Sequence, residues 1–157
     1  MKEAAAIVLT LVATGKATAY REGLMEKVVE NRLKWGHIDT SLPHTGYVAL
    51  ADKKYVGERV LLELPTGEWV GPLLVADCGA MKDQQHLVDI GFAIDLSYPL
   101  AVKYLKNPRT PLHGVRVWLL EDERDHLHRL TGEVEKYWGE HPELISDGNT
   151  GGNENED

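Results

Sequence analysis

Two aspartates follow apolar runs of the chain, a setting that changes how readily a carboxyl group loses its proton. Asp95 comes after an apolar segment, residues 92–94, and Asp77 comes after the apolar run of residues 72–76. Apolar surroundings desolvate a carboxylate and favour its protonated form, and a second carboxylate nearby acts in the same direction. A carboxylic acid that stays protonated near neutral pH can donate its proton to the oxygen of a glycosidic bond. Both aspartates are therefore candidates for acid chemistry on a glycan.

The same aspartates also have a purely structural explanation. An aspartate at the end of a strand commonly accepts hydrogen bonds from the following turn, and Asp95 is placed to support a turn into a helix at Ser97. The other potential metal ligands in the middle of the chain are His37, His44, Cys78 and His86. Their spacing matches no familiar zinc pattern. We expect neither a metal nor an organic cofactor.

Short β-rich segments separated by turn residues must position these aspartates. Six segments have the composition and length of strands. They are residues 16–20, 46–51, 57–64, 72–76, 92–96 and 115–120. Six short strands without a regular alternation of strand and helix favour a small barrel over a parallel α/β sheet.

Helical patterns lie between and after the strands. The first has an apolar face at helical spacing, made by Leu24, Met25, Val28, Val29 and Leu33. A second helix is expected to begin at Ser97, with Pro99 in its first turn, where a missing N–H costs little. A third is expected within residues 130–138. Residues 81–91, between the two aspartates, are expected to be a solvated connection, with a lid or specificity loop as the alternative.

The two ends of the chain differ in composition from the middle. Residues 4–13 form an apolar stretch that is typical of a leader peptide and too short to cross a bilayer as a helix; a retained N-terminal helix is the alternative. The acidic tail has no apolar residue to offset its ordering entropy and is expected to be disordered. The expected organisation is a leader or N-terminal segment at 1–14, a barrel at 15–120, a helical extension at 121–146 and the disordered tail at 147–157.

Charge and cysteine content exclude several classes of protein. The formal net charge is −8 over 157 residues, and no basic stripe with interleaved aromatic residues is present, so a nucleic-acid partner is disfavoured. The single cysteine, Cys78, excludes an intrachain disulfide framework. Hydrophobic residues at 43% and charged residues at 27% describe an ordinary globular domain.

Three segments in matching order resemble one family of proteins. Residues 15–23 read GKATAYREG, residues 49–50 and 56–60 read AL and VGERV, and the third segment pairs VADCG at 75–79 with AIDLS at 93–97. They resemble motifs shared by rare lipoprotein A, the expansins and, more loosely, membrane-bound lytic transglycosylase A. The resemblance implies a mostly β fold, a six-stranded double-psi β-barrel with short peripheral helices.

The resemblance also implies roles for individual residues. In catalytic members the aspartate of the Asp-Leu-Ser signature is the general acid, here Asp95, and the aspartate of Val-x-Asp-x-Gly, here Asp77, flanks the same groove. The related endoglucanases carry a further aspartate on the opening strand, whereas residues 16–20 contain no acid and Glu22 lies just beyond them. That absence favours lytic transglycosylases, in which the sugar's own hydroxyl attacks, or expansins over ordinary hydrolysis. Cys78 departs from the arginine that often follows this aspartate in rare lipoprotein A.

These observations lead to two expectations about function. One is a cell-wall or polysaccharide-acting protein that cleaves peptidoglycan strands in the manner of a lytic transglycosylase. The other is a non-catalytic module that binds glycan or protein at an envelope or particle surface, and an intracellular barrel with a small-molecule role is a third reading. The residues expected to bind substrate are Thr18, Tyr20, Tyr47 and Tyr98, and the three tyrosine rings can stack on sugar rings. The expected partner is peptidoglycan or another polysaccharide. The expected location is secreted or in the cell envelope, with the cytoplasm as the alternative, and no stable membrane span is expected.

Overall fold

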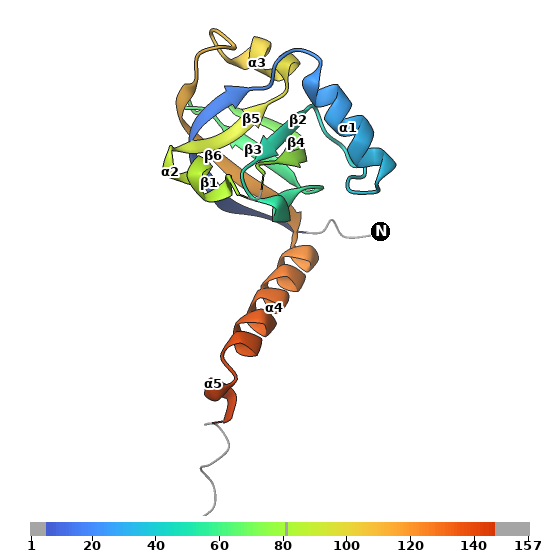
Figure 1. The fold of residues 1–157 in the computed structure, drawn as a ribbon, viewed down its shortest axis with the longest axis vertical. Helices are drawn as coiled ribbons and strands as arrows, with labels where there is room; N and C mark the ends of the chain where they lie inside the picture. The colour runs from blue at the N-terminus through green and yellow to red at the C-terminus, as the bar shows by residue number, and fades with distance from the viewer. Residues whose placement is uncertain (1–5, 81, 147–157) are drawn as a thin grey trace, which may run out of the picture. The chain divides into compact units, whose positions relative to one another are not determined.

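The structure is a computed structural model that describes residues 6–80 and 82–146 (Figure 1). The chain divides into two compact units, one of residues 8–121 and one of residues 1–7 with 122–157. The first unit carries the strands and both aspartates. Its architecture therefore decides what the aspartates can do.

Six strands form a closed barrel in the order β1-β5-β2-β4-β3-β6. Their bounds are Ile7–Ala19 for β1, Tyr47–Leu50 for β2, Arg59–Glu63 for β3, Trp69–Cys78 for β4, Phe92–Leu96 for β5 and Leu112–Asp122 for β6. The β1–β5 and β2–β4 pairs are parallel, whereas β2–β5, β3–β4 and β3–β6 are antiparallel. The expectation of a mostly β fold built on a six-stranded barrel is confirmed.

Strand β1 begins at Ile7 rather than at Lys16, where the sequence indicated its start. Residues 7–14, assigned above to a leader or N-terminal segment, therefore belong to a barrel strand, and the alternative of a helix there is wrong for residues 7–13. The run is rich in β-branched side chains, which favour the extended backbone. Removal of residues 1–14 as a leader would take away the first part of this strand. Residues 1–5 lie outside the described residues.

A close backbone contact fixes the middle of β1 against β5. Gly15 has φ +142°, and a Cβ at this position would lie 2.1 Å from the carbonyl oxygen of Gly91. The next residue, Lys16, donates its N–H to that same oxygen at 2.8 Å. Only glycine leaves room for this approach.

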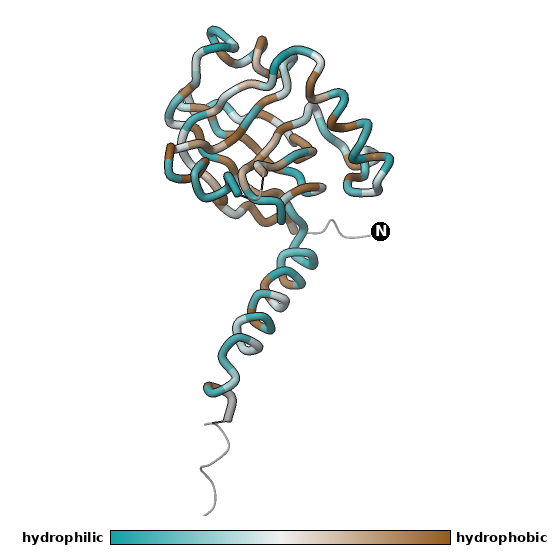
Figure 2. The backbone as a smooth tube through the Cα atoms, viewed as in Figure 1, coloured by the Kyte–Doolittle hydropathy of each residue, from teal (hydrophilic) through white to brown (hydrophobic). Residues whose placement is uncertain are grey.

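The strands separate an interior core from a second core on the outer side of the barrel. Val48, Ile94 and Leu96 lie in the interior cluster, where all three are essentially inaccessible to solvent. Ala49, the neighbour of Val48 on β2, lies instead in the outer cluster with Met25, a residue of the first helix. This alternation follows from the two-residue period of a strand. Figure 2 shows hydrophobic residues concentrated along the barrel strands.

Helix α1 (Leu24–Lys34) packs against β4 on the outside of the barrel (Figure 1). Its Met25 and Val29 are buried there with Leu74 and Ala76 of β4, as the apolar spacing predicted. Because α1 packs on β4, the Arg32 side chain at the edge of its apolar face reaches Asp77 near the end of that strand.

The remaining helices of the barrel unit are short. The 3-10 helix η1 is Lys53–Tyr55, α2 is Gln84–Asp89 and α3 is Tyr98–Tyr104, with a proline in the first turn of α3 as expected. Helix α2 lies within the segment that the sequence analysis described as a solvated connection. None of its residues is buried.

The second unit contains α4 (Glu123–Glu140) and α5 (Glu143–Ser146). Helix α4 starts earlier than the segment 130–138 indicated by its sequence, because the Asp122 carboxylate caps it by accepting the Asp125 N–H at 2.7 Å. The tail at 147–157, expected to be disordered, lies outside the described residues. Within the described parts of the chain, no helix has the length and apolar composition needed to cross a bilayer.

Candidate functional site

Backbone register brings the two aspartates onto one face of the barrel. Asp77 on β4 stands opposite Ala49 on β2, Ala49 stands opposite Asp95 on β5, and Asp95 stands opposite Thr18 on β1. Residues directly opposite each other project to the same face. Ala49 alone separates the two aspartates in this row, and the spacing of strands places their α-carbons about 9–10 Å apart.

An irregularity in β4 helps to create this row. The β2–β4 register shifts between Val48 and Ala49, so that Val48 pairs with Val75 but Ala49 pairs with Asp77, and Ala76 is the extra residue. A bulge of this kind re-aims the side chains that follow it. Without the shift, Ala76 would stand opposite Ala49 and Asp77 would turn away from the face of Asp95.

The carboxylate of Asp77 is held by two partners. Tyr20 donates its hydroxyl to Oδ2 at 2.6 Å, and the Nη2 of Arg32 lies 3.0 Å from Oδ1. The Arg32 and Asp77 side chains are only 19% and 21% exposed, so solvent screens this ion pair incompletely. Arg32 also contacts Cys78 Sγ at 3.9 Å and His37 Nδ1 at 2.9 Å. Asp77 is thus a fixed, charge-paired carboxylate.

Asp95 has a different environment. Burial raises the pKa of its carboxyl group, a hydrogen bond donated by the Thr18 hydroxyl to Oδ1 works against that rise, and the negative charge of Asp77 adds to it. The net result is a pKa above the usual value for aspartate. Asp95 therefore retains its proton at a pH where an ordinary aspartate has lost it, which is the property that a general acid needs.

Tyr20 directly follows β1, and its hydroxyl bonds Asp77 of the Arg32–Asp77 ion pair. Burial, the hydrogen bond to Asp77 and the charge of that carboxylate all raise the pKa of the Tyr20 phenol. The charges of Asp95 and Cys78 act in the same direction. Tyr20 consequently stays a neutral hydrogen-bond donor throughout the physiological range, rather than an acid or base.

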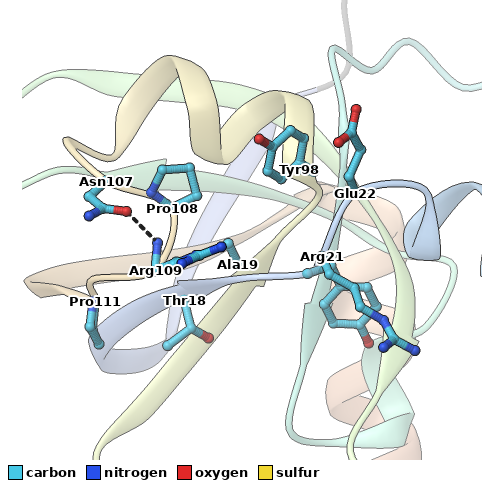
Figure 3. Close-up of a pocket in the computed structure, with 10 residues that line it drawn as sticks. Thr18, Ala19, Arg21, Glu22, Tyr98, Asn107, Pro108, Arg109 and Pro111 are labelled. Atoms are coloured by element: carbon cyan, nitrogen blue, oxygen red, sulfur yellow. Dashed lines mark hydrogen bonds between the residues drawn. The ribbon is translucent and has the colours of Figure 1, made fainter.

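A pocket of about 610 Å³ opens beside the row (Figure 3). Its lining residues are Thr18, Ala19, Tyr20, Arg21, Glu22, Tyr98, Asn107, Pro108, Arg109 and Pro111. Thr18 belongs both to this lining and to the row, since its hydroxyl bonds Asp95. The pocket thus reaches Asp95 through one side chain.

The structure gathers most, but not all, of the residues expected to bind substrate. Thr18, Tyr20 and Tyr98 line the pocket. Tyr47 packs against the outer cluster and against the His44 ring, with the ring centroids 5.0 Å apart, and is not part of the pocket lining. Asp77 and Asp95 are outside the lining and approach it only through Tyr20 and Thr18.

Two arginines were missed by reasoning from sequence. Arg32 follows Met25 and Val29 by seven and three residues, so its helical spacing already placed it on the face of α1 that meets the barrel. Arg109 reaches the pocket from the loop after α3, and no local pattern signals that, because barrel closure decides which strand the loop meets.

No further chemistry is indicated by clustered metal ligands. In the described residues, no three His, Cys, Asp or Glu side chains converge as a metal site.

Comparison of the chain with models of known protein families, with curated proteins and with solved structures finds no match in any of the three.

Proposed function

We propose that this chain acts on peptidoglycan or another polysaccharide and cleaves its glycan strands with Asp95 as general acid. The observation that carries the proposal is the state of Asp95, a carboxyl group with a raised pKa that shares Thr18 with a pocket of about 610 Å³. Such a pocket is large enough for one or more sugar rings. A location in the cell envelope or outside the cell follows from this substrate.

The barrel would be of the double-psi type. Two interlocked psi loops require parallel pairs between strands that are distant in sequence, and the parallel β1–β5 and β2–β4 pairs support this topology. The arrangement of the two aspartate segments supports this topology as well, since Asp77 lies on β4 and Asp95 on β5, and both strands pair with β2.

The reaction would proceed by intramolecular attack. Asp95 gives its proton to the glycosidic oxygen as the bond from that oxygen to the anomeric carbon breaks. A hydroxyl of the same sugar bonds to the anomeric carbon, and its proton returns to the Asp95 carboxylate. The product is an anhydro sugar, and no water is consumed.

The surroundings of Asp95 favour this route over hydrolysis. A hydrolase needs a second carboxylate to activate water or attack the sugar. Thr18 occupies the position opposite Asp95 on β1, and both Asp77 oxygens are already bonded. Glu22 is the single carboxylate in the pocket lining and is exposed at its edge.

Digestion of purified peptidoglycan tests the proposal. Products released by the wild type, Asp95→Asn and Glu22→Gln are compared by mass spectrometry, with Asp39→Asn as a control at an exposed carboxylate bonded to Ser41. We expect anhydro-sugar products from all but Asp95→Asn, whose rate falls at least about 100-fold, the usual contribution of a general acid. Undiminished cleavage by Asp95→Asn contradicts the mechanism, and reducing-end products that depend on Glu22 indicate hydrolysis instead.

A non-catalytic glycan-binding module is the second candidate. It is favoured by one observation, that neither aspartate lines the pocket. In that case no variant releases products, yet the wild type and Asp95→Asn sediment equally with insoluble wall material. Sedimentation that is lost when Tyr98 is replaced by alanine would locate the binding surface at the pocket.

A further inference from the structure

The pocket beside Asp95 carries positive charge that the barrel itself does not neutralise. Arg21 and Arg109 both line it, and neither has an ion pair or side-chain hydrogen bond among the described residues. This is unusual in a chain whose net charge is −8, because acidic groups are plentiful elsewhere on it. Only Glu22 brings a carboxylate to the lining.

Arg109 is presented by a short, constrained turn. The Asn107 side chain accepts the Arg109 N–H at 2.9 Å, and the Asn107 carbonyl accepts the Thr110 N–H at 2.9 Å. Pro108 and Pro111 restrict the backbone on either side. In Figure 3 the Arg109 side chain extends from this turn toward Ala19 of β1, with Tyr98 on the other side of the pocket.

The chemistry of these groups matches one kind of ligand. A guanidinium binds a carboxylate through two parallel hydrogen bonds, and this geometry selects a planar anion. The Tyr98 ring offers an apolar face of the kind that stacks on a sugar. Thr18, also in the lining, donates its hydroxyl to the Asp95 carboxyl group. A strongly charged polyanion fits less well, because Glu22 and the net charge of the chain repel it.

We propose that this pocket is a binding subsite for a sugar that carries a carboxylate, with Arg109 holding the carboxylate and Tyr98 lying against the ring. The inference rests on the proposed function, in that the ligand is a glycan, and it adds the acidic substituent that selects among glycans. A uronic acid and a lactyl-substituted amino sugar both supply this chemistry.

Binding measurements test the subsite without requiring cleavage. Isothermal titration compares an oligosaccharide with a single uronic acid, an oligosaccharide with a single N-acetylmuramic acid and a neutral chitin oligomer of the same length. The proteins are the wild type, Arg109→Gln and, as a matched control, Arg116→Gln on the exposed side of β6. Because Arg109 is exposed, its replacement leaves the barrel core untouched, and thermal unfolding verifies this.

The expected result is a preference of the wild type for at least one acidic ligand that weakens with added salt. Arg109→Gln should lower that affinity about tenfold to a hundredfold, the usual loss of a charged hydrogen-bonding partner, and leave neutral-ligand binding unchanged. Whichever acidic ligand loses more affinity identifies the source of the carboxylate. Equal affinities for acidic and neutral ligands, or equal losses in Arg109→Gln and Arg116→Gln, overturn the inference.

Failure of the subsite and failure of the proposed reaction are separable. Cleavage that depends on Asp95, with binding indifferent to Arg109, refutes the subsite alone. Carboxylate binding that depends on Arg109, without any product from glycan, supports the subsite and refutes catalysis.

Discussion

Asp77 and Asp95 lie in one row on the barrel surface, but their carboxyl groups have different partners. Asp77 is bonded by Arg32 and Tyr20 at both oxygens, whereas Asp95 is partly buried beside Thr18 and has no cation among its described partners. The first carboxylate has a cation at hydrogen-bond distance, whereas desolvation raises the pKa of the second. Two chemically identical side chains thus have different properties because their neighbours differ, as carboxylate pairs in glycan-cleaving sites require.

The difference between the two environments indicates a separate role for each aspartate. Asp95 is the proton donor in the proposed reaction, and Asp77 is a fixed negative charge that discourages Asp95 from ionising. Arg32 and Tyr20 act indirectly, by holding Asp77 in place. Substituting each residue should therefore alter the difference between the two aspartates in its own measurable way.

Removal of the cation at Asp77 should have the largest effect on stability. Arg32→Met leaves a mostly buried carboxylate without its charged partner, and we expect the free energy of unfolding to fall by about 1.5–3 kcal/mol. Urea denaturation measures the change. Arg116→Met, which removes an exposed 3.9 Å ion pair with Glu63, should cost less than about 1 kcal/mol. Equal losses in the two variants would mean that Asp77 does not depend on Arg32.

Removal of the second partner should have a smaller effect. Tyr20→Phe deletes one hydrogen bond to Asp77 and should lower the free energy of unfolding by about 1 kcal/mol. The raised pKa of Tyr20 also makes its phenol the last to ionise in an alkaline titration. Phenolate absorbance should therefore lose its latest component in this variant. Loss of an early component instead would show that Tyr20 is accessible to solvent.

The contrast also predicts how stability depends on pH. Because the folded-state pKa of Asp95 lies above its unfolded value, the folded protein binds this proton more tightly. Its contribution to stability is complete below the unfolded pKa of about 3.9 and is lost as the pH rises through the folded pKa. The difference in unfolding free energy between the wild type and Asp95→Asn should shrink across that window. A constant difference would argue against a raised pKa.

The smallest effect is the electrostatic influence of Asp77 on its neighbour. Asp77→Asn removes the negative charge and leaves Arg32 unpaired, so the pKa of Asp95 should fall. Thr18→Val, which removes the bond donated to Asp95, should raise it instead. Carbon-detected NMR titration of the carboxyl groups reads both changes. Shifts of the same sign in both variants would contradict the assigned causes.

Local patterns in the sequence were sufficient for the strands, the apolar face of α1 and the start of α3. They failed for the first half of β1, because an apolar run without charges has the same composition in a leader peptide and in a strand. They also failed for the pairing of Arg32 with Asp77, which depends on the packing of α1 against β4. Tyr47, which was expected to bind substrate, packs against the outer cluster and does not line the pocket. An aromatic residue on a strand has no local signal that distinguishes a groove from a core.

The contact between Gly15 and the Gly91 carbonyl has a consequence for which substitutions the fold accepts. Geometry alone excludes every residue larger than glycine at position 15. Asp95 meets no comparable steric demand, since an amide of the same shape fits its place. Replacing Asp95 by asparagine can therefore change the chemistry of the site while the barrel stays intact. Replacing Gly15 by a larger residue instead disturbs the approach of β1 to the Gly91 carbonyl.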